Sequence, residues 1–280
     1  MYPIIDFFGV PTSAWTLLVT IGLLAALFSC NAMAIKRKFS VKLQRLLIVN
    51  FIITIVVAVF GAMLFQAFYD YIKYGTFDLF NSGLTFYGGF IFGVGAFLGV
   101  WFLGGKLIGI GDEVKQRFSD MADIAACVIP MAHGFGRIGC FLGGCCHGAP
   151  TSEWYGVFMH TETGYQKVVP VQLYEAIVLF MIAGVLFWLF FKGETWNKKE
   201  LPLLPLYTIS YGVWRFLIEY ARTDDRGSLP ILTFLSPSQL TALILIAAGG
   251  VYLWIWYKTR QKQASELQKN ESDSDAVSEK

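Results

Sequence analysis

Long apolar segments, each of roughly 20 residues, follow one another along most of this chain, and a helix of that length crosses a lipid bilayer. Of the 280 residues, 55% are hydrophobic and 15% are charged, whereas a soluble chain carries about 25% charged residues. A soluble core of this size could not bury so much apolar surface. We therefore expect an all-α, polytopic membrane protein with about seven transmembrane helices, near residues 13–34, 47–69, 83–104, 122–142, 172–191, 203–221 and 239–257.

Lysine and arginine are distributed unevenly between the connecting loops. Basic residues are concentrated after the first, third, fifth and last apolar segments, whereas the intervening loops hold few. Because basic loops stay on the cytoplasmic side of the membrane, the pattern predicts an outer N-terminus and a cytoplasmic C-terminus. The longest outer loop is then 144–170, and its Trp154 and Tyr155 suit the interface between lipid and water.

The domain organisation follows from the same pattern. We expect one transmembrane domain over residues 1–260 and a disordered, polar cytoplasmic tail over 261–280. The first span itself is expected to direct insertion, because residues 1–6 lack the basic region of a cleavable signal peptide. The net charge of +2 says nothing about nucleic acid, but the chain has no long basic face to bind it, so nucleic acid is not expected as a partner. The lipid bilayer is the expected surrounding.

Polar side chains of four predicted spans fall at one depth, just below the outer surface. The predicted orientation places the starts of the third and fifth spans and the ends of the fourth and sixth at this level. Charged groups inside a membrane are costly, so they face protein or a water-filled cavity and mark functional sites. The residues concerned are Tyr87, Arg137, Cys140, Gln172, Glu175, Arg215, Glu219 and Arg222.

The sixth predicted span carries a stripe of polar residues on one helical face. The residues at i, i+4, i+8 and i+11 are Tyr211, Arg215, Glu219 and Arg222. Arg215 can form an ion pair with Glu219, one turn further along. The side chain of Arg222 also suits a position among the lipid headgroups, and this alternative stays open. Arg215 lies about two turns deeper, where such snorkelling is harder, so a binding role is favoured.

Arginine at this depth predicts a particular kind of ligand. Arg137 lies between Gly136 and Gly139, and glycines allow a ligand to approach the backbone closely. Arginine keeps its charge and binds oxyanions through two parallel N–H donors. Two or three guanidinium groups at headgroup depth therefore predict a phosphate ligand, and the phosphate found at that depth belongs to a phospholipid.

Five motifs are spread over most of the chain. They are SGLTFYGGFIFG (82–93), GRIGCFLGGCCHG (136–148), VPVQLYEA (169–176), YGVWRFLIEYAR (211–222) and LSPSQL (235–240). Together they resemble the prolipoprotein diacylglyceryl transferase family of bacterial membranes. The resemblance implies a divergent, cysteine-rich member of that family, and a multi-pass protein of the bacterial cytoplasmic (inner) membrane.

The resemblance also implies a reaction. The diacylglyceryl group of phosphatidylglycerol is transferred to the lipobox cysteine thiol in the signal peptide of a prolipoprotein, so that a thioether forms and glycerol phosphate leaves without a cofactor. Carried onto this sequence, it implies that Arg137 and Arg215 bind and neutralise the phosphate. Because fixed cations stabilise charge on a leaving phosphate, our hypothesis is that these two arginines carry most of the catalysis. The other residues it places around the substrate are Gly88, Gly89, Gly136, Gly139, Cys140, Gln172, Tyr174, Glu175, Glu219 and Arg222.

Four positions depart from the family pattern and leave the activation of the acceptor thiol open. Two of them are Gly143 and Cys145, which stand at the next polar positions of the arginine-glycine motif. Tyr87 stands where the family usually has histidine, and Cys140 stands where it usually has asparagine. Tyr87 is a catalytic candidate that hydrogen-bonds the headgroup or relays a proton, or it is a tyrosine of the membrane interface. His147 is a candidate replacement base, because imidazole titrates near neutral pH, or it is an exposed loop residue.

Three cysteines gather at the end of the fourth predicted span, next to a histidine. Their C-x4-C-C-H spacing does not match the usual zinc ligand patterns, so no metal is expected. A disulfide between Cys140 and either Cys145 or Cys146 suits the oxidising outer side. A packing role for Cys140 and a thiol that carries lipid covalently are the alternatives. Cys30 and Cys127, inside spans, are interpreted as small buried apolar residues.

Other functions would use the same arginines. A related transferase would keep the phospholipid donor and take a different acceptor, whereas a transporter of phospholipids or anions would bind its cargo with the arginines. The transporter is disfavoured, because the polar residues gather on one side of the membrane and no internal repeat is evident, whereas transporters bind near the midplane. A redox sensor built on the cysteines is a further alternative.

Overall fold

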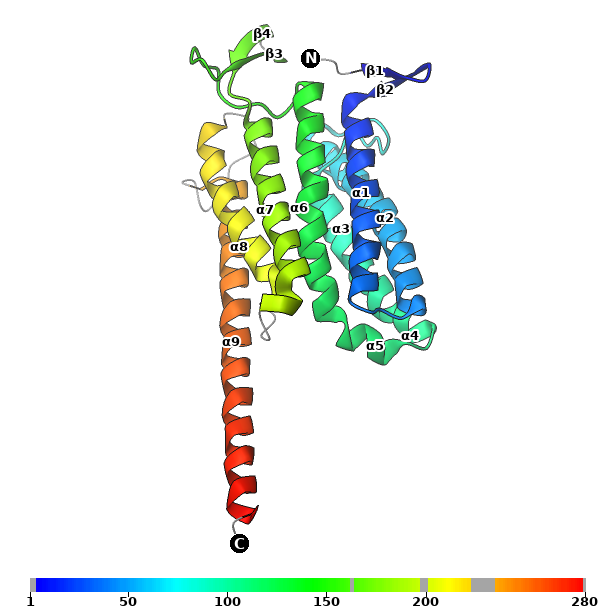
Figure 1. Ribbon diagram of the computed structural model, residues 1–280. Helices are drawn as coiled ribbons and strands as arrows, with labels where there is room; N and C mark the ends of the chain where they lie inside the picture. The colour runs from blue at the N-terminus through cyan, green and yellow to red at the C-terminus, as the bar shows by residue number, and fades with distance from the viewer. Residues whose placement is uncertain (1–3, 162–163, 197–200, 223–234, 279–280) are drawn as a thin grey trace. The chain divides into compact units, whose positions relative to one another are not determined.

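The computed structural model is mainly helical and forms two compact units (Figure 1). The residues that it describes are 4–161, 164–196, 201–222 and 235–278. The first unit contains Met1–Leu23 and Ala125–Lys280, and the second unit contains Leu24–Ile124. The single transmembrane domain predicted over 1–260 stays a prediction.

The second unit is built around two helices that pack through small residues. Its elements are α2 (Val41–Tyr74), α3 (Phe86–Gly99), the π-helical η1 (Val100–Gly104), α4 (Gly105–Leu107) and α5 (Gly111–Gln116). Gly88 of α3 has no room for a Cβ atom, because the carbonyl group of Gly61 in α2 lies against it. Such close approach is typical of membrane helices. Asn50, which is buried, donates from Nδ2 to the carbonyl of Phe97 at 3.1 Å and joins the same two helices.

The first unit contains the helices that carry most of the predicted site residues. Its elements are β1 (Ile4–Phe7), β2 (Val10–Ser13), α1 (Ala14–Lys36), α6 (Phe118–Gly143), β3 (Val157–Thr161), β4 (Gly164–Val168), α7 (Val171–Trp196), α8 (Leu203–Ile218), the 3-10 turn η2 (Glu219–Ala221) and α9 (Pro237–Ser278). Of these, α1 and α6 each have residues in both units. The strands β1 and β2, and likewise β3 and β4, form antiparallel hairpins. Both hairpins lie at one end of this unit, and the free end of α9 lies at the other (Figure 1).

The two hairpins correct the all-α prediction. In β1–β2, Ile4 pairs with Ser13, and the turn residues Phe8 and Gly9 have φ values of 53° and 83°, as two-residue hairpins require. In β3–β4, Val157 pairs with Val168 within the predicted outer loop. Each strand has only four or five residues, which is too short for the alternation of polar and apolar residues to stand out in a sequence dominated by helices.

Six helices in the described part of the chain are long and apolar enough to cross a membrane. They are α1, α2, the continuous stretch Phe86–Leu107, α6, α7 and the first part of α9. The sixth predicted span, 203–221, contains α8, which has 16 residues and rises about 24 Å, against about 30 Å of hydrocarbon in a bilayer. Polar residues explain the difference, because Arg215 and Glu219 stand where an apolar span would continue.

The C-terminal tail is helical where composition predicted disorder. α9 continues to Ser278, although residues after 260 are polar. The reason is that this stretch contains no glycine or proline and many good helix formers, so a helix already nucleated in the apolar part extends through it. Lys262 and Glu266, one turn apart, lie 3.9 Å from each other.

Candidate functional site

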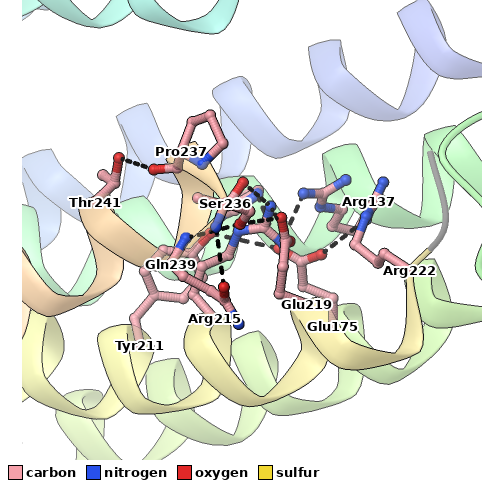
Figure 2. Close-up of polar contacts among 12 residues, drawn as sticks. Arg137, Glu175, Tyr211, Arg215, Glu219, Arg222, Ser236, Pro237, Gln239 and Thr241 are labelled. Atoms are coloured by element: carbon pink, nitrogen blue, oxygen red, sulfur yellow. Dashed lines mark hydrogen bonds and ion pairs between the residues drawn. The ribbon is translucent and has the colours of Figure 1, made fainter. Parts of the chain in front are cut away.

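Side chains from α6, α7, α8 and the segment after η2 converge on one buried carboxylate in the first unit (Figure 2). Glu175 of α7 is 0% exposed, and its Oε1 accepts a hydrogen bond from Arg137 Nη2 at 3.0 Å. The Tyr211 hydroxyl donates to the same oxygen at 3.4 Å, and His133 Nε2 lies 3.9 Å from it. Arg222 Nη1 lies 4.0 Å from Oε2. Glu175 therefore holds Arg137 by a hydrogen bond and forms a longer ion pair with Arg222, which comes from a different part of the chain.

The start of α7 explains why Glu175 faces inward. Pro170 precedes the helix and accepts the amide hydrogen of Leu173 at 3.0 Å, so the first turn is well formed. Gln172 and Glu175 are three residues apart and share one helical face, and both side chains are completely buried. Removing a carboxylate from water costs several kcal/mol unless it is paired, and the two arginines supply that pairing.

A second polar cluster joins the end of α8 to the start of α9 (Figure 2). Arg215 Nη2 lies 3.0 Å from Glu219 Oε2 and also donates to Ser238 Oγ at 2.8 Å. The hydroxyl of Ser236 donates to Glu219 Oε1 at 2.7 Å. The backbone N–H of Ser236 donates to Gln239 Oε1 at 3.0 Å, while Ser236 Oγ accepts the Gln239 N–H at 3.1 Å. This reciprocal pattern is a capping box, and it holds the first turn of α9 against Arg215.

The charges of the two clusters do not cancel. Three guanidinium groups, of Arg137, Arg215 and Arg222, face two carboxylates, of Glu175 and Glu219, so three positive charges minus two negative charges leave +1. Arg215 and Arg222 are buried, and the Nε of Arg137 has no hydrogen-bond partner among the described residues. A surplus positive charge and an open guanidinium donor at low dielectric favour an anionic ligand.

The end of α6 brings three thiols together. Gly144, with φ of 77°, lets its own N–H reach the carbonyl of Phe141 and the Cys145 N–H reach the carbonyl of Cys140, at 3.2 and 3.1 Å. These two bonds form a Schellman motif, which reverses the chain. Cys146 follows with φ of 60°, and the sulfurs of Cys140, Cys145 and Cys146 all lie within 4.8 Å of one another. All three are free thiols, so the predicted disulfide is absent from this structure.

The loop after the thiols is held against the rest of the site. Gln172 Nε2 donates to the carbonyl of Cys145 at 2.6 Å, and the N–H of Gly148 donates to Val169 at 2.9 Å. His147 Nδ1 lies 3.0 Å from the carbonyl of Gly148, so this imidazole faces its own loop. The predicted role of His147 as a base stays a prediction.

The three thiols have different acidities. Hydrogen bonds from Cys140 and Cys145 to the sulfur of Cys146, with smaller effects of the nearby cations Arg137 and Arg222, lower the pKa of Cys146 well below its usual range. The pKa of Cys145 is raised, because its hydrogen bonds to the other two thiols favour its protonated form. One sulfur of the cluster is therefore the natural place for a thiolate.

Several predicted residues have other surroundings. Tyr87 belongs to the second unit, is 41% exposed and packs its ring edge-on against Phe86. Gly88 contacts α2, as described above, and Gly89 lies near Ala58 of the same helix. A ligand-binding role for these three residues stays a prediction.

The glycines on either side of Arg137 differ from each other. A Cβ atom on Gly139 would lie 3.1 Å from the Cα of Trp15, so Gly139 serves the packing of α6 against α1. Beside Gly136 the nearest atom, Cγ2 of Val19, would be 3.9 Å away, which leaves room at this position. Tyr174 is half-buried on α7. Of these positions, Gly136 alone keeps the open backbone that the sequence predicted for a ligand.

Sequence reasoning missed three residues that contact the candidate site. Ser236, Ser238 and Gln239 contact the Arg215–Glu219 pair or the turn that holds it, although the sequence singled out their segment only as a motif. The Ser-Pro-Ser-Gln sequence was an available signal, because serine followed three residues later by glutamine predicts a capping box. A helix that starts at this capping box begins the last span at its outer end. The hydroxyl groups of Ser236 and Ser238 would then have been expected near the outer end of the sixth predicted span.

Comparison with known proteins adds a family and named relatives. The family model described as prolipoprotein diacylglyceryl transferase matches residues 3–256. The chain is 39% identical over 133 residues to the phosphatidylglycerol–prolipoprotein diacylglyceryl transferase of Clostridium tetani (strain Massachusetts / E88). This alignment covers 46% of this chain and 50% of the relative. It is 33% identical over 178 residues to phosphatidylglycerol–prolipoprotein diacylglyceryl transferase 2 of Clostridium perfringens (strain 13 / Type A), with 62% of each chain covered. The matched regions therefore span 50% and 62% of these two relatives.

A longer match is found outside that genus. The chain is 27% identical over 227 residues to the phosphatidylglycerol–prolipoprotein diacylglyceryl transferase of Xylella fastidiosa (strain M23). This alignment covers 70% of the chain and 71% of the relative. The similarity is therefore not confined to one segment of the sequence.

Proposed function

Because the chain belongs to the prolipoprotein diacylglyceryl transferase family, we propose that it transfers the diacylglyceryl group of phosphatidylglycerol to the lipobox cysteine thiol of a prolipoprotein. The thiol gives up its proton to water, its sulfur forms a bond to the glyceryl carbon, the bond from that carbon to the phosphate oxygen breaks, and glycerol phosphate leaves with the electron pair. Support comes from the names of the relatives and from the surplus positive charge around Glu175, which suits a phosphate.

Arg137 is the first candidate for holding the phosphate. Its Nη2 is fixed by Glu175 at 3.0 Å, which leaves the Nε edge of the guanidinium group for another acceptor. Arg215 is fixed in a similar way by Glu219 and Ser238. Donors held in place before the reaction stabilise negative charge on the leaving phosphate, and one such contact is typically worth a factor of about 10²–10³ in rate.

The site is proposed to lie at the outer surface of the bacterial cytoplasmic membrane. The loop that joins α6 to β3 and the start of α7 lie toward the end of the first unit that carries the hairpins, whereas α9 ends at the other end (Figure 1). Helix α9 carries the basic residues Lys258, Arg260 and Lys262. Because basic segments stay in the cytoplasm, the hairpin end faces outward. A prolipoprotein exported through the membrane would present its lipobox cysteine on that side.

A reconstituted assay tests the function. The purified chain in vesicles of phosphatidylglycerol is given a lipobox peptide, and both the lipid-modified peptide and the released glycerol phosphate are measured by mass spectrometry. We expect both products from the wild type, and about 10²–10³-fold less from Arg137→Ala and Arg215→Ala. Arg260→Ala is the matched control, since this arginine lies over the ring of Trp256 on α9 and belongs to neither polar cluster.

Two outcomes would contradict the proposal in different ways. Release of glycerol phosphate without modification of the peptide would mean that the donor is right and the acceptor is a different molecule. Absence of both products from an inserted, folded protein would mean that the chain does not carry out this transfer. After the second result, the next function to test would be transport of a phospholipid or anion that the same arginines bind.

A further inference from the structure

We propose that the thiols of Cys140, Cys145 and Cys146 bind one Zn²⁺ ion, and that the fourth coordination position of this ion receives the acceptor cysteine thiol. The second half of the proposal rests on the proposed function, whereas the metal site does not. The sequence argued against a shared ion, because the C-x4-C-C spacing is unusual and neighbouring residues seldom reach one metal together.

The fold removes that objection. The Schellman motif at the end of α6 places Cys145 beside Cys140, although the two are five residues apart. Cys146 has left-handed backbone, with φ of 60°. Its side chain therefore points in a different direction from the one that it would take if the backbone there were extended. As a result, three sulfurs lie within 4.8 Å of one another.

The sulfur spacing suits zinc. Zinc–sulfur bonds are about 2.3 Å long, so two sulfurs on one tetrahedral ion are about 3.8 Å apart. From separations of at most 4.8 Å, such a site needs shifts of about 1 Å or less, which thiol rotation can supply. Cys145 is exposed and the other two are half-buried, so an ion can enter from solvent.

The surroundings favour the charge of the resulting site. Three thiolates carry −3 and Zn²⁺ carries +2, so the complex has a net charge of −1. The polar clusters around Glu175 and Glu219 carry a surplus charge of +1, which is opposite in sign to the charge of this complex. The loop is also held in place, because the fully buried Gln172 donates to the carbonyl of Cys145. Fixed ligand supports of this kind are typical of metal sites.

Three protein ligands leave one position open, as in catalytic rather than structural zinc sites. A thiol that binds there gives up its proton to water and becomes a metal-bound thiolate. Its sulfur then attacks the glyceryl carbon of the phospholipid, the carbon–oxygen bond to the phosphate breaks, and the oxygen keeps the electron pair. The arginine cluster next to the thiols would stabilise that leaving phosphate, so nucleophile and leaving group are served by adjacent groups.

Metal binding is tested first and without the reaction. The detergent-purified full-length chain is stripped with a chelator, reloaded with Zn²⁺ and passed through gel filtration, and its zinc content is measured by mass spectrometry. We expect about one zinc per chain, and with Co²⁺ we expect thiolate-to-metal charge transfer and the intense visible bands of a tetrahedral site. A chain without retained zinc, or one with a disulfide among these cysteines after purification under reducing conditions, would overturn the site.

Variants separate the ligands from the other thiols. Cys145→Ser and Cys146→Ser are expected to lower zinc affinity at least about tenfold. Cys145→His keeps a ligand atom at this position, so it should retain more zinc than Cys145→Ser. Cys127→Ala is the control, because this thiol is buried in the same helix, outside the cluster. Zinc affinity that is the same in Cys145→Ser and in the wild type would overturn the assignment of the ligands.

The transfer assay then tests the open position. Stripped protein is expected to lose transfer at least about tenfold and to recover it with Zn²⁺. Full transfer by the stripped protein would overturn the role of the metal while leaving the proposed function intact. Zinc bound by these thiols in a chain that transfers nothing, stripped or loaded, would support the metal site and contradict the proposed function instead.

Discussion

Glu175 organises the candidate site at the scale of single residues, because its carboxylate contacts Arg137, Tyr211 and Arg222. Glu175→Gln keeps the volume but removes the ion pairs, so the guanidinium groups lose their fixed positions. We expect turnover to fall about 10²-fold, since a displacement near 1 Å costs about that much. The KM for phosphatidylglycerol should not rise. With Glu175 neutral, three guanidinium groups face one carboxylate, so the surplus positive charge rises from +1 to +2 and still attracts the phosphate. Steady-state kinetics in vesicles measure both quantities.

Glu266→Gln is the matched control for this change. Glu266 is exposed on α9 and lies 3.9 Å from Lys262, and exposed pairs of this kind contribute little. A Glu175→Gln protein with unchanged turnover and a raised KM would contradict the positioning role and mark Glu175 as a contact to the bound lipid.

The sequence predicted much of this site at the residue scale. The spacing predicted one helical face for Tyr211, Arg215, Glu219 and Arg222, and the Arg215–Glu219 pair is confirmed at 3.0 Å. The single face does not extend to Arg222, because α8 ends at Ile218 and Arg222 has extended backbone. The cost of a charge inside a membrane makes such residues conspicuous. Glu175 was expected to support the site, but its pairing with Arg137 was not predicted, because contacts between helices depend on their rotation and packing.

At the scale of elements, Gly148 connects the thiol loop to α7 and η2. Its N–H donates to Val169, and a Cβ atom at this position would lie 2.6 Å from the carbonyl oxygen of Ala221. Gly148→Ala therefore forces backbone apart, and overpacking of this kind costs about 1–3 kcal/mol. We expect a lower unfolding temperature in detergent, measured by scanning fluorimetry. Gly143→Ala, where nothing lies within 4 Å of the added carbon, should unfold like the wild type, and equal values for both variants would contradict the close packing.

Elements that depend on long-range packing escaped prediction. The helices were predicted because apolar length is a strong signal, whereas the hairpins rest on four- and five-residue strands. The thiol cluster is a clearer case. The separation of Cys140 from Cys145 and Cys146 argued against a shared ion, and the αL residues Gly144 and Cys146, which follow α6, bring the three sulfurs together. Backbone reversals of this kind carry a weak sequence signal, since glycine is frequent throughout the chain.

At the scale of the whole molecule, the distribution of lysine and arginine predicts that the hairpin end and the end of α9 lie on opposite sides of the membrane. Trp154, in the loop before β3, is 89% exposed, and Ser265 on α9 is exposed as well. In a cysteine-free chain, Trp154→Cys should react with a membrane-impermeant maleimide on intact cells, whereas Ser265→Cys should react only after lysis.

Each variant serves as the control of the other, because both are exposed sites in one background. Labelling of Ser265→Cys on intact cells, with Trp154→Cys protected, would reverse the orientation and place the arginine cluster toward the cytoplasm. An exported prolipoprotein could not then reach the phosphate-binding residues from the outer side. The orientation therefore decides whether the surplus positive charge around Glu175 is available to the reaction proposed for it.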